Sequence, residues 1–253
     1  MTKVLLFFIF LNFNYCAAQS DSIILNACYE WNLTDSIITA GTISKEKAIK
    51  DILRLSNKII KRTEITLNGT LRNNIPFNFP LQNFGNIDSI RFFMNGDDYN
   101  DENYDYFQGS NSIGHPAHDI IINDRDKDLN DDITGKPVDV VSVSGGIVIA
   151  INNSWKAGSL LRGGKYVKIF DPAKNSIYYY SHLSSVTVYP GTLIESGMKI
   201  GEVGRTGRKA VLKEGSTHLH ISYLKIEEGY PFPQDFFSEL IRSYTKIKLT
   251  RTK

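Results

Sequence analysis

The second half of the chain consists of short apolar segments, rich in β-branched residues, that glycine residues separate. From about Gly109 onward this pattern is typical of an antiparallel β protein, because glycine tolerates the backbone angles of tight turns between strands. The run from Val140 to Ile151, interrupted by Gly145-Gly146, predicts a β-hairpin. Strands are expected near 118–122, 138–143, 146–151, 165–170, 176–182, 186–188, 199–203 and 217–224. The predicted fold class is mainly β, with a core that is an antiparallel sheet or sandwich.

The rest of the chain divides into smaller parts around this core. At 253 residues the length allows one domain and a smaller partner. Apolar positions between about 44 and 62 recur at helical spacing, whereas residues 19–43 show no sustained period. We therefore expect an N-terminal α+β appendage over 19–108 with one helix, in which 64–95 form a covering layer. The β domain is expected over 109–230. Residues 231–253 are expected to form a C-terminal helix, which ends at about Tyr244, and a basic tail.

The N-terminus has the pattern of a secretory signal over residues 1–18. Lys3 precedes an apolar run from Val4 to Phe13, and small residues follow, so cleavage is expected after Ala18. An uncleaved anchor is the lesser alternative, because a membrane-spanning helix needs about 20 apolar residues. A lipid anchor on Cys16 is a further alternative, although Asn14-Tyr15 stand where small residues are usual. We expect an exported protein, periplasmic or in the cell envelope or outside the cell, with no membrane span once the signal is removed.

Composition limits the partners and the redox chemistry. Removal of the signal leaves Cys28 alone, so no intramolecular disulfide can form, and its apolar neighbours predict a buried, inert thiol. The formal charge of +2 is spread thinly, which argues against nucleic acid as a partner. The basic C-terminal tail is expected to be solvated, with weak attraction to an anionic wall polymer as the alternative.

All five histidines fall into three short segments of the β region, and four of them, all except His118, are candidates for metal binding or proton transfer. A catalytic zinc ion needs three protein ligands and one open position. His115, Asp119 and one histidine of the pair His218-Leu-His220 supply such a set. Side chains at i and i+2 share one face of a strand, so the pair faces the same way. The two histidines left over, of which His182 is one, become candidates for proton transfer.

These segments resemble the lysostaphin-type zinc endopeptidases, which cut the peptides of bacterial peptidoglycan and have the duplicated hybrid motif fold. The resemblance covers residues 109–225. It rests on the His-x-x-x-Asp element at His115, the Ser-His-Leu element at His182, the glycine turn series from Gly191 to Gly207, and the His-x-His element at His218. All four elements occur in the family's order with roughly its spacing.

The resemblance implies a role for each residue of the site. His115, Asp119 and His220 would bind Zn²⁺, and His182 and His218 would be the catalytic histidines. The zinc ion would lower the pKa of a water molecule toward about 7 and polarise the scissile carbonyl, while the two histidines handle the proton. The expected substrates are peptidoglycan stem or cross-bridge peptides.

Departures from the family pattern leave two other functions open. Ala117 replaces a usual glycine, and Ser216-Thr217 and Ile221-Ser222 differ from the usual neighbours of the His-x-His element, which bears on substrate preference. A non-catalytic relative that binds cell wall or activates another hydrolase is the main alternative, but its metal ligands would be eroded. A biotinyl- or lipoyl-type carrier is the third, but Lys199 stands inside a strand pattern rather than at a turn.

Three further features have structural interpretations. His118, next to Asp119, is expected to form a hydrogen bond that supports the ligand geometry. The acidic runs 95–105 and 124–132 are expected to be exposed loops, since the second lacks the glycine and glutamate of an EF-hand. Strand alternation puts Tyr178 and Tyr180 on the face of His182, where one of them could contact substrate, although ordinary packing is favoured.

Overall fold

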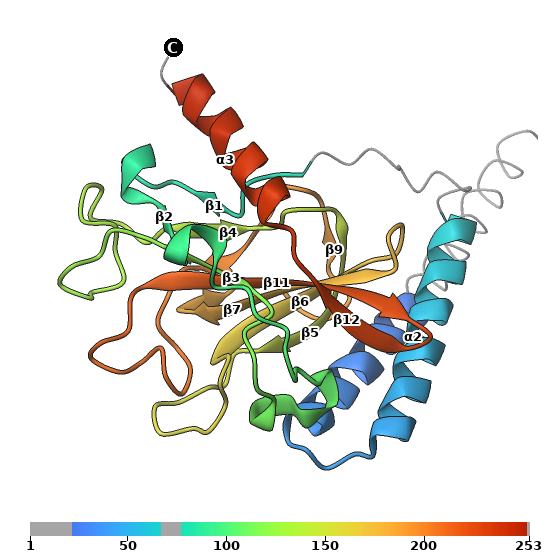
Figure 1. Ribbon diagram of the computed structural model, residues 1–253. Helices are drawn as coiled ribbons and strands as arrows, with labels where there is room; N and C mark the ends of the chain where they lie inside the picture. Colours follow the sequence, from blue (N-terminus) through green and yellow to red (C-terminus); the bar gives the residue numbers. More distant parts are fainter. Residues whose placement is uncertain (1–21, 67–76, 252–253) are drawn as a thin grey trace, which may run out of the picture.

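The computed structural model describes residues 22–66 and 77–251 and contains two antiparallel sheets (Figure 1). The smaller sheet has the strand order β1 (Leu81–Gln82), β4 (Asp139–Val141), β10 (Lys199–Glu202) and β8 (Ser185–Val186). The larger sheet has the order β2 (Arg91–Phe92), β3 (His118–Ile121), β11 (His218–Glu227), β7 (Ser176–Leu183), β6 (Lys165–Asp171), β5 (Gly146–Asn152) and β9 (Leu193–Ile194). A further strand, β12 (Tyr230–Gln234), pairs with the second half of β11. The expected mainly antiparallel β fold is confirmed.

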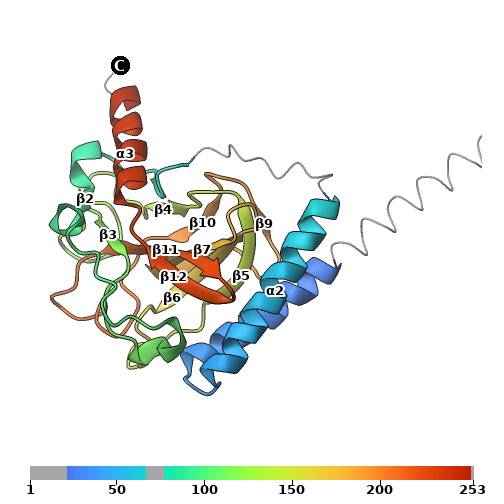
Figure 2. The same cartoon turned by 45° about the vertical axis from the view of Figure 1, so that its right-hand side comes forward.

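Helices cover one face of the larger sheet. A helix over residues 22–39 and α2 (Lys45–Thr66) run side by side against this face (Figure 2). The α3 helix (Phe237–Arg251) follows β12, and three short 3₁₀ helices, η1 (Ile87–Ser89), η2 (Phe93–Gly96) and η3 (Tyr106–Asn111), lie before β3. No helix among the described residues is long and apolar enough to cross a lipid bilayer.

The core has two layers because alternate residues of the long strands point to opposite faces. Leu219 and Ile221 of β11 belong to a cluster between the two sheets. Leu224 and Ile226, on the other face of β11, pack beneath the two N-terminal helices. The helices therefore cover the end of the same β11 face that presents His218 and His220 nearer the start of the strand.

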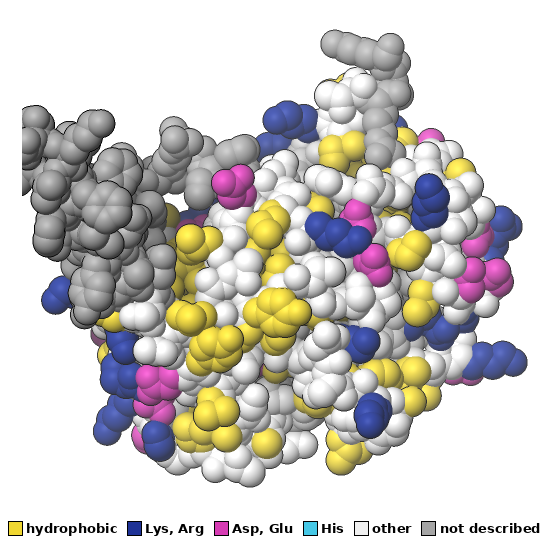
Figure 3. All heavy atoms as spheres, turned by 180° about the vertical axis from the view of Figure 1, so that it is seen from behind, with side chains coloured by type: hydrophobic (Ala, Val, Ile, Leu, Met, Phe, Trp, Pro, Cys, Tyr) yellow, Lys and Arg dark blue, Asp and Glu magenta, His cyan; other side chains and the backbone are white. Residues whose placement is uncertain are grey.

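The prediction of a single N-terminal helix was wrong, since residues 22–39 are also helical. The inward face of this helix carries buried apolar residues such as Ile24 and Trp31. Its outward face also carries large apolar side chains, which are 39–66% exposed and repeat every four residues: Leu25, Tyr29, Leu33 and Ile37. Hydrophobic side chains of this kind are visible on the back of the molecule (Figure 3). A surface helix is recognised in a sequence by apolar residues on one face only, and this helix lacks that pattern because both of its faces are apolar.

One prediction about the strands was also wrong. Val140 and Ile147 do not lie in one hairpin, because β4 and β5 belong to different sheets. Gly146 instead lies where β5 approaches β6, since a Cβ there would be 2.4 Å from the carbonyl oxygen of Phe170. Within the stretch 64–95, β1 and β2 each extend a sheet, and the assignment of this stretch as a covering layer stays a prediction.

Other expectations have mixed outcomes. The expected strands between 118 and 224 are present, whereas β9 and β12 were not predicted, and the C-terminal helix reaches Arg251 instead of Tyr244. Cys28 is buried as expected, and burial raises the pKa of its thiol to about 12. The predicted signal over 1–18 lies outside the described residues, and the boundary between 108 and 109 stays a prediction.

Candidate metal and catalytic site

Strand pairing brings the three predicted ligands together. Asp119 of β3 is the direct cross-strand partner of His220 of β11. His115 lies in the segment just before β3, and its backbone pairs with Asn100. One donor atom from each of His115, Asp119 and His220 lies within 4.8 Å of the other two. Two imidazoles and one carboxylate form a donor set suited to a catalytic zinc ion.

Asp98, which the sequence analysis did not identify, fixes the orientation of this group. Its backbone carbonyl accepts a hydrogen bond from Nδ1 of His115 at 2.8 Å, which leaves Nε2 of that ring to face Asp119 at 3.3 Å. The Asp98 carboxylate accepts the backbone N–H of Asp119 at 2.8 Å. The other carboxylate oxygen lies 3.1 Å from Nδ1 of His118, whose Nε2 lies 3.0 Å from Asp235. The buried His118 thus supports the ligands indirectly, in keeping with its expected structural role.

His182 and His218 lie beside the ligand group, with ring centroids 4.7 Å apart. Nδ1 of His182 is 2.6 Å from the carbonyl of Thr206, and Nδ1 of His218 is 2.8 Å from the carbonyl of Ser216. Because a carbonyl can only accept, each Nδ1 carries the proton, and Nε2 of each ring is left as an acceptor. His182 has a φ of +63°, a strained angle for a residue other than glycine.

The electrostatics of the site follow from burial and from the central carboxylate. Burial opposes ionisation of Asp119, but its contacts with His115 and His220 outweigh this effect and hold its pKa well below the usual value. Burial would lower the pKa of His115, yet Asp119 outweighs it and the pKa is raised. Burial, reinforced by the nearby His218 and His220, holds the pKa of His182 well below its usual value, which favours the neutral ring.

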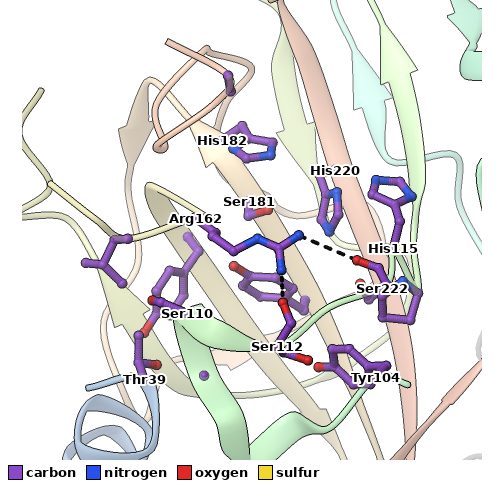
Figure 4. A pocket seen from close by; sticks show the side chains of 18 of the residues that line it. Thr39, Tyr104, Ser110, Ser112, His115, Arg162, Ser181, His182, His220 and Ser222 are labelled. Atoms are coloured by element: carbon purple, nitrogen blue, oxygen red, sulfur yellow. Dashed lines mark hydrogen bonds between the residues drawn. The ribbon is translucent and has the colours of Figure 1, made fainter. Parts of the chain in front are cut away.

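All five residues line one cavity of 370 Å³, which extends from the ligand group along the larger sheet. Figure 4 shows His115, His182 and His220 around it, with Arg162 over its centre. The Arg162 guanidinium donates to the backbone carbonyls of Ser112 and Gly114. No histidine side chain is visible on the part of the back of the molecule that Figure 3 leaves uncovered.

Tyr178 and Tyr180 of β7 pack in the core, as was favoured, but they do not lie on the face of His182. Tyr178 and Tyr180 are buried between the two sheets, whereas Tyr179 lines the cavity. The positive φ of His182 interrupts the alternation of β7, so this histidine shares the cavity with Tyr179. Simple alternation of side chains along the strand could not predict this backbone irregularity at His182.

The two acidic runs differ from simple exposed loops. Asp98 and Tyr104 of the first run support or line the site. In the second run, Asp126 and Asp128 are exposed, but Asp124 is buried and accepts a hydrogen bond from Thr217, the residue before His218. Asp124 thus helps to hold the start of β11.

A comparison with protein-family models identifies the domain. Residues 132–231 match the model described as peptidase family M23. The chain contains an M23 domain. The matched segment includes His182, His218 and His220, while His115 and Asp119 precede it. The family suggested by the sequence motifs is thereby confirmed.

The chain also has a fold similar to several solved structures. The catalytic domain of lysostaphin from Staphylococcus simulans is 20% identical, with a TM-score of 0.39, over 61% of this chain and 95% of the other. A protein assigned as the glycyl-glycine endopeptidase LytM from Ruminococcus gnavus is 17% identical, with a TM-score of 0.48, over 85% and 87%. A zinc-containing peptidase from Vibrio cholerae is 20% identical, with a TM-score of 0.39; 62% of this chain matches, spanning only 39% of that protein. No curated protein matches significantly.

Proposed function

We propose that this M23 chain is an exported, zinc-dependent endopeptidase that hydrolyses peptide bonds in the stem or cross-bridge peptides of bacterial peptidoglycan. The observation that carries the proposal is the mutual approach of one donor atom each from His115, Asp119 and His220, within 4.8 Å, beside two further histidines. The M23 match supports peptidase chemistry. The composition of residues 1–18 supports export.

The three ligand candidates would hold the metal, and the fit of their donor set is good. Because Nδ1 of His115 is bonded to the Asp98 carbonyl, Nε2 of this ring faces the other two ligand candidates. Asp119 is held in place by the hydrogen bond from its backbone N–H to the Asp98 carboxylate. A bound zinc ion would supply Lewis acidity toward water and the scissile carbonyl. The residues would have to bind it with one coordination position left open for reaction.

His182 and His218 would move the proton. With Nδ1 of each ring bonded to a carbonyl, Nε2 can accept a proton from the attacking water and later deliver one to the leaving amine. The same carbonyl contacts hold both rings in place, so little reorientation is needed before transfer. The protonated ring would also stabilise negative charge that develops on the carbonyl oxygen.

The alternative is a non-catalytic relative that binds cell wall or activates another hydrolase. The presence of all five site residues favours the enzyme over this alternative. The deciding experiment incubates the purified mature chain with peptidoglycan, with and without a chelator, and identifies new amino termini by mass spectrometry. We expect new termini that disappear with the chelator and return with added zinc. Wall binding without any new terminus would favour the non-catalytic alternative.

A further inference from the structure

The start of the C-terminal helix α3 lies close to the ligand group. Gln234, at the end of β12, is the cross-strand partner of Tyr223 of β11, which follows His220 by three residues. Asp235 and Phe236 come next and lead into α3, whose start lies beside β3 (Figure 1). The pairing of β12 with β11 therefore fixes where Asp235 lies relative to the strand that presents His220.

His118 joins Asp235 to the ligand group. Nε2 of the His118 ring lies 3.0 Å from Oδ1 of Asp235, and Nδ1 lies 3.1 Å from Oδ1 of Asp98. The second carboxylate oxygen of Asp98 accepts the backbone N–H of Asp119, and the backbone carbonyl of Asp98 accepts from His115. A continuous series of polar contacts thus runs from the start of α3 to two of the three ligand candidates.

The middle of this series is buried, whereas its Asp235 end reaches the surface. The side chains of His118 and Asp98 are 1% and 3% exposed, and that of Asp235 is 57% exposed. A buried polar atom without a hydrogen-bond partner is costly, so both nitrogens of the His118 ring need a partner. Asp235 is the partner of Nε2, and this contact keeps Nδ1 directed at Asp98.

Aromatic rings hold the His118 ring in this orientation. Tyr99 stacks on it, with ring centroids 5.7 Å apart and an interplanar angle of 29°. The rings of Phe236 and Phe237 pack against it at centroid distances of 5.5 Å and 5.2 Å. These rings come from the same two short segments that carry the two acidic partners of the histidine. A shift of either segment would therefore move the imidazole.

The two segments also pack directly against each other. Gly96 has a φ of +99°, and a Cβ at this position would lie 2.6 Å from Cε1 of Phe237. Glycine permits this close approach because it has no side chain. Asp98 follows Gly96 by two residues, so the start of α3 limits the positions that the Asp98 segment can occupy.

We propose that Asp235 is a positioning residue of the metal site, acting through His118 and Asp98 on the orientation of His115 and Asp119. Outer contacts of this kind set how a ligand side chain faces its metal ion. The inference rests on the proposed function, since it assumes that the last two residues bind zinc. All five residues lie outside the segment 132–231 that matches the M23 model, so the family match does not imply this arrangement.

Three substitutions of Asp235 separate this role from a purely structural one. The Asp235 carboxylate also accepts the backbone N–H of Phe237 at 2.8 Å, which is one of the donors without a partner inside α3. Serine can still accept this N–H, but its side chain is one bond shorter and does not reach His118. Asparagine keeps an oxygen atom for both contacts, and alanine provides neither.

The first measurement is the zinc Kd of the full mature chain, by competition with a chromogenic chelator. Asp235→Ala and Asp235→Ser should each raise the Kd about tenfold, the lower end of the effect of outer contacts on metal affinity. Asp235→Asn should restore a Kd close to that of the unchanged chain. Glu239→Gln is the control, because this acid in the first turn of α3 bonds to Ser238 rather than to His118.

A second readout needs neither zinc nor turnover. In NMR spectra of the zinc-free chain, the backbone amide proton of Asp119, which donates to Asp98, should shift in Asp235→Ser and Asp235→Ala. It should stay in place in Glu239→Gln. A shift would show that the change at Asp235 reaches the Asp119 ligand candidate.

The outcomes distinguish this inference from the proposed function. An unchanged zinc Kd in Asp235→Ser, with a loss in Asp235→Ala alone, would mean that Asp235 only caps the helix and would overturn the inference. Unchanged Kd values in all three variants would overturn it as well, while leaving a zinc peptidase intact. An unchanged chain that neither binds zinc nor cleaves peptidoglycan would contradict the proposed function and, with it, this inference.

Discussion

At the residue scale, the geometry of the three ligand candidates depends on neighbouring residues that would not themselves bind the metal. Asp98 contacts His115 through its backbone and Asp119 and His118 through its carboxylate. Such outer contacts fix which ring nitrogen faces a metal ion and how the carboxylate is oriented. Asp98 therefore determines the geometry of two of the three ligand candidates.

Asp98→Ala should weaken zinc binding by about 10–100-fold, because the Asp119 backbone and His118 lose their shared acceptor. Competition with a chromogenic chelator measures the change in Kd. Asp97→Ala is the matched control, since Asp97 is adjacent but exposed. Equal zinc affinities of the two variants would show that the Asp98 carboxylate does not support zinc binding.

Lys168 permits a prediction about stability. Burial alone would lower the pKa of Lys168, but Asp35 outweighs burial and the pKa is raised. The ion pair therefore contributes fully below the usual lysine pKa, and its contribution is lost only as pH rises through the raised value. Lys168→Met should lower the free energy of unfolding at pH 7 by about 3–5 kcal/mol, because it leaves Asp35 buried without its partner.

Urea unfolding measures this loss, with two comparisons. Lys174→Met removes a more exposed lysine and should cost less than about 1 kcal/mol. The double variant Asp35→Leu with Lys168→Met should recover most of the loss, since two apolar side chains replace the whole pair. A small effect of Lys168→Met alone would mean that water reaches Asp35.

The gathering of the five residues in one cavity could be predicted from the sequence because histidine and aspartate occur in a recognisable order, while their roles stay predictions. Asp98 could not, because it lies in a run of acidic and polar residues that has the composition of an exposed loop. Its contact with Asp119 joins residues 21 positions apart. The buried ion pair of Asp35 and Lys168 could not be predicted either, since the two residues are 133 positions apart.

At the element scale, the strands were predictable where they are long, and alternation along β11 correctly separated His218 and His220 from Leu219 and Ile221. Alternation failed at His182, where the backbone is irregular. The helix over 22–39 was missed because both of its faces are apolar. The turn between β4 and β5 resembled a hairpin because sequence does not tell a tight turn from a connection between two sheets.

The turn that follows β10 positions His182, and Gly207 is its critical residue. Gly207 has a φ of +117°, and a Cβ there would lie 2.3 Å from the carbonyl oxygen of Arg162 and 2.8 Å from Nδ1 of His182. Gly207→Ala should displace the His182 ring, so we expect about 100-fold loss of hydrolysis, the lower end of what one general base contributes, with zinc content retained.

Gly135→Ala is the control for this prediction. Gly135 also has a positive φ, +61°, but no atom lies within 4 Å of the added methyl group. Both variants bear a backbone penalty of roughly 1–2 kcal/mol, so a difference in activity reports on His182. Metal analysis and peptidoglycan hydrolysis are measured on both. Full activity of Gly207→Ala would mean that the ring position is not critical.

At the scale of the whole molecule, one face of the larger sheet has two uses. Near the start of β11 it presents the ligand group, and farther along it packs against the N-terminal helices. These helices are therefore part of the groove as well as of the core. The M23 match, which begins at residue 132, does not include these helices, although Ile38 and Thr39 of the first helix line the cavity.

The most direct test of the central claim measures bound zinc and peptidoglycan hydrolysis on the same preparations of four variants. His115→Ala and His220→Ala should lose both zinc and activity, whereas His182→Ala and His218→Ala should retain zinc and lose activity. This separation is expected because only the first two histidines would bind the metal. Full activity of His115→Ala, or loss of zinc from His182→Ala, would contradict the assignment of ligands and proton carriers.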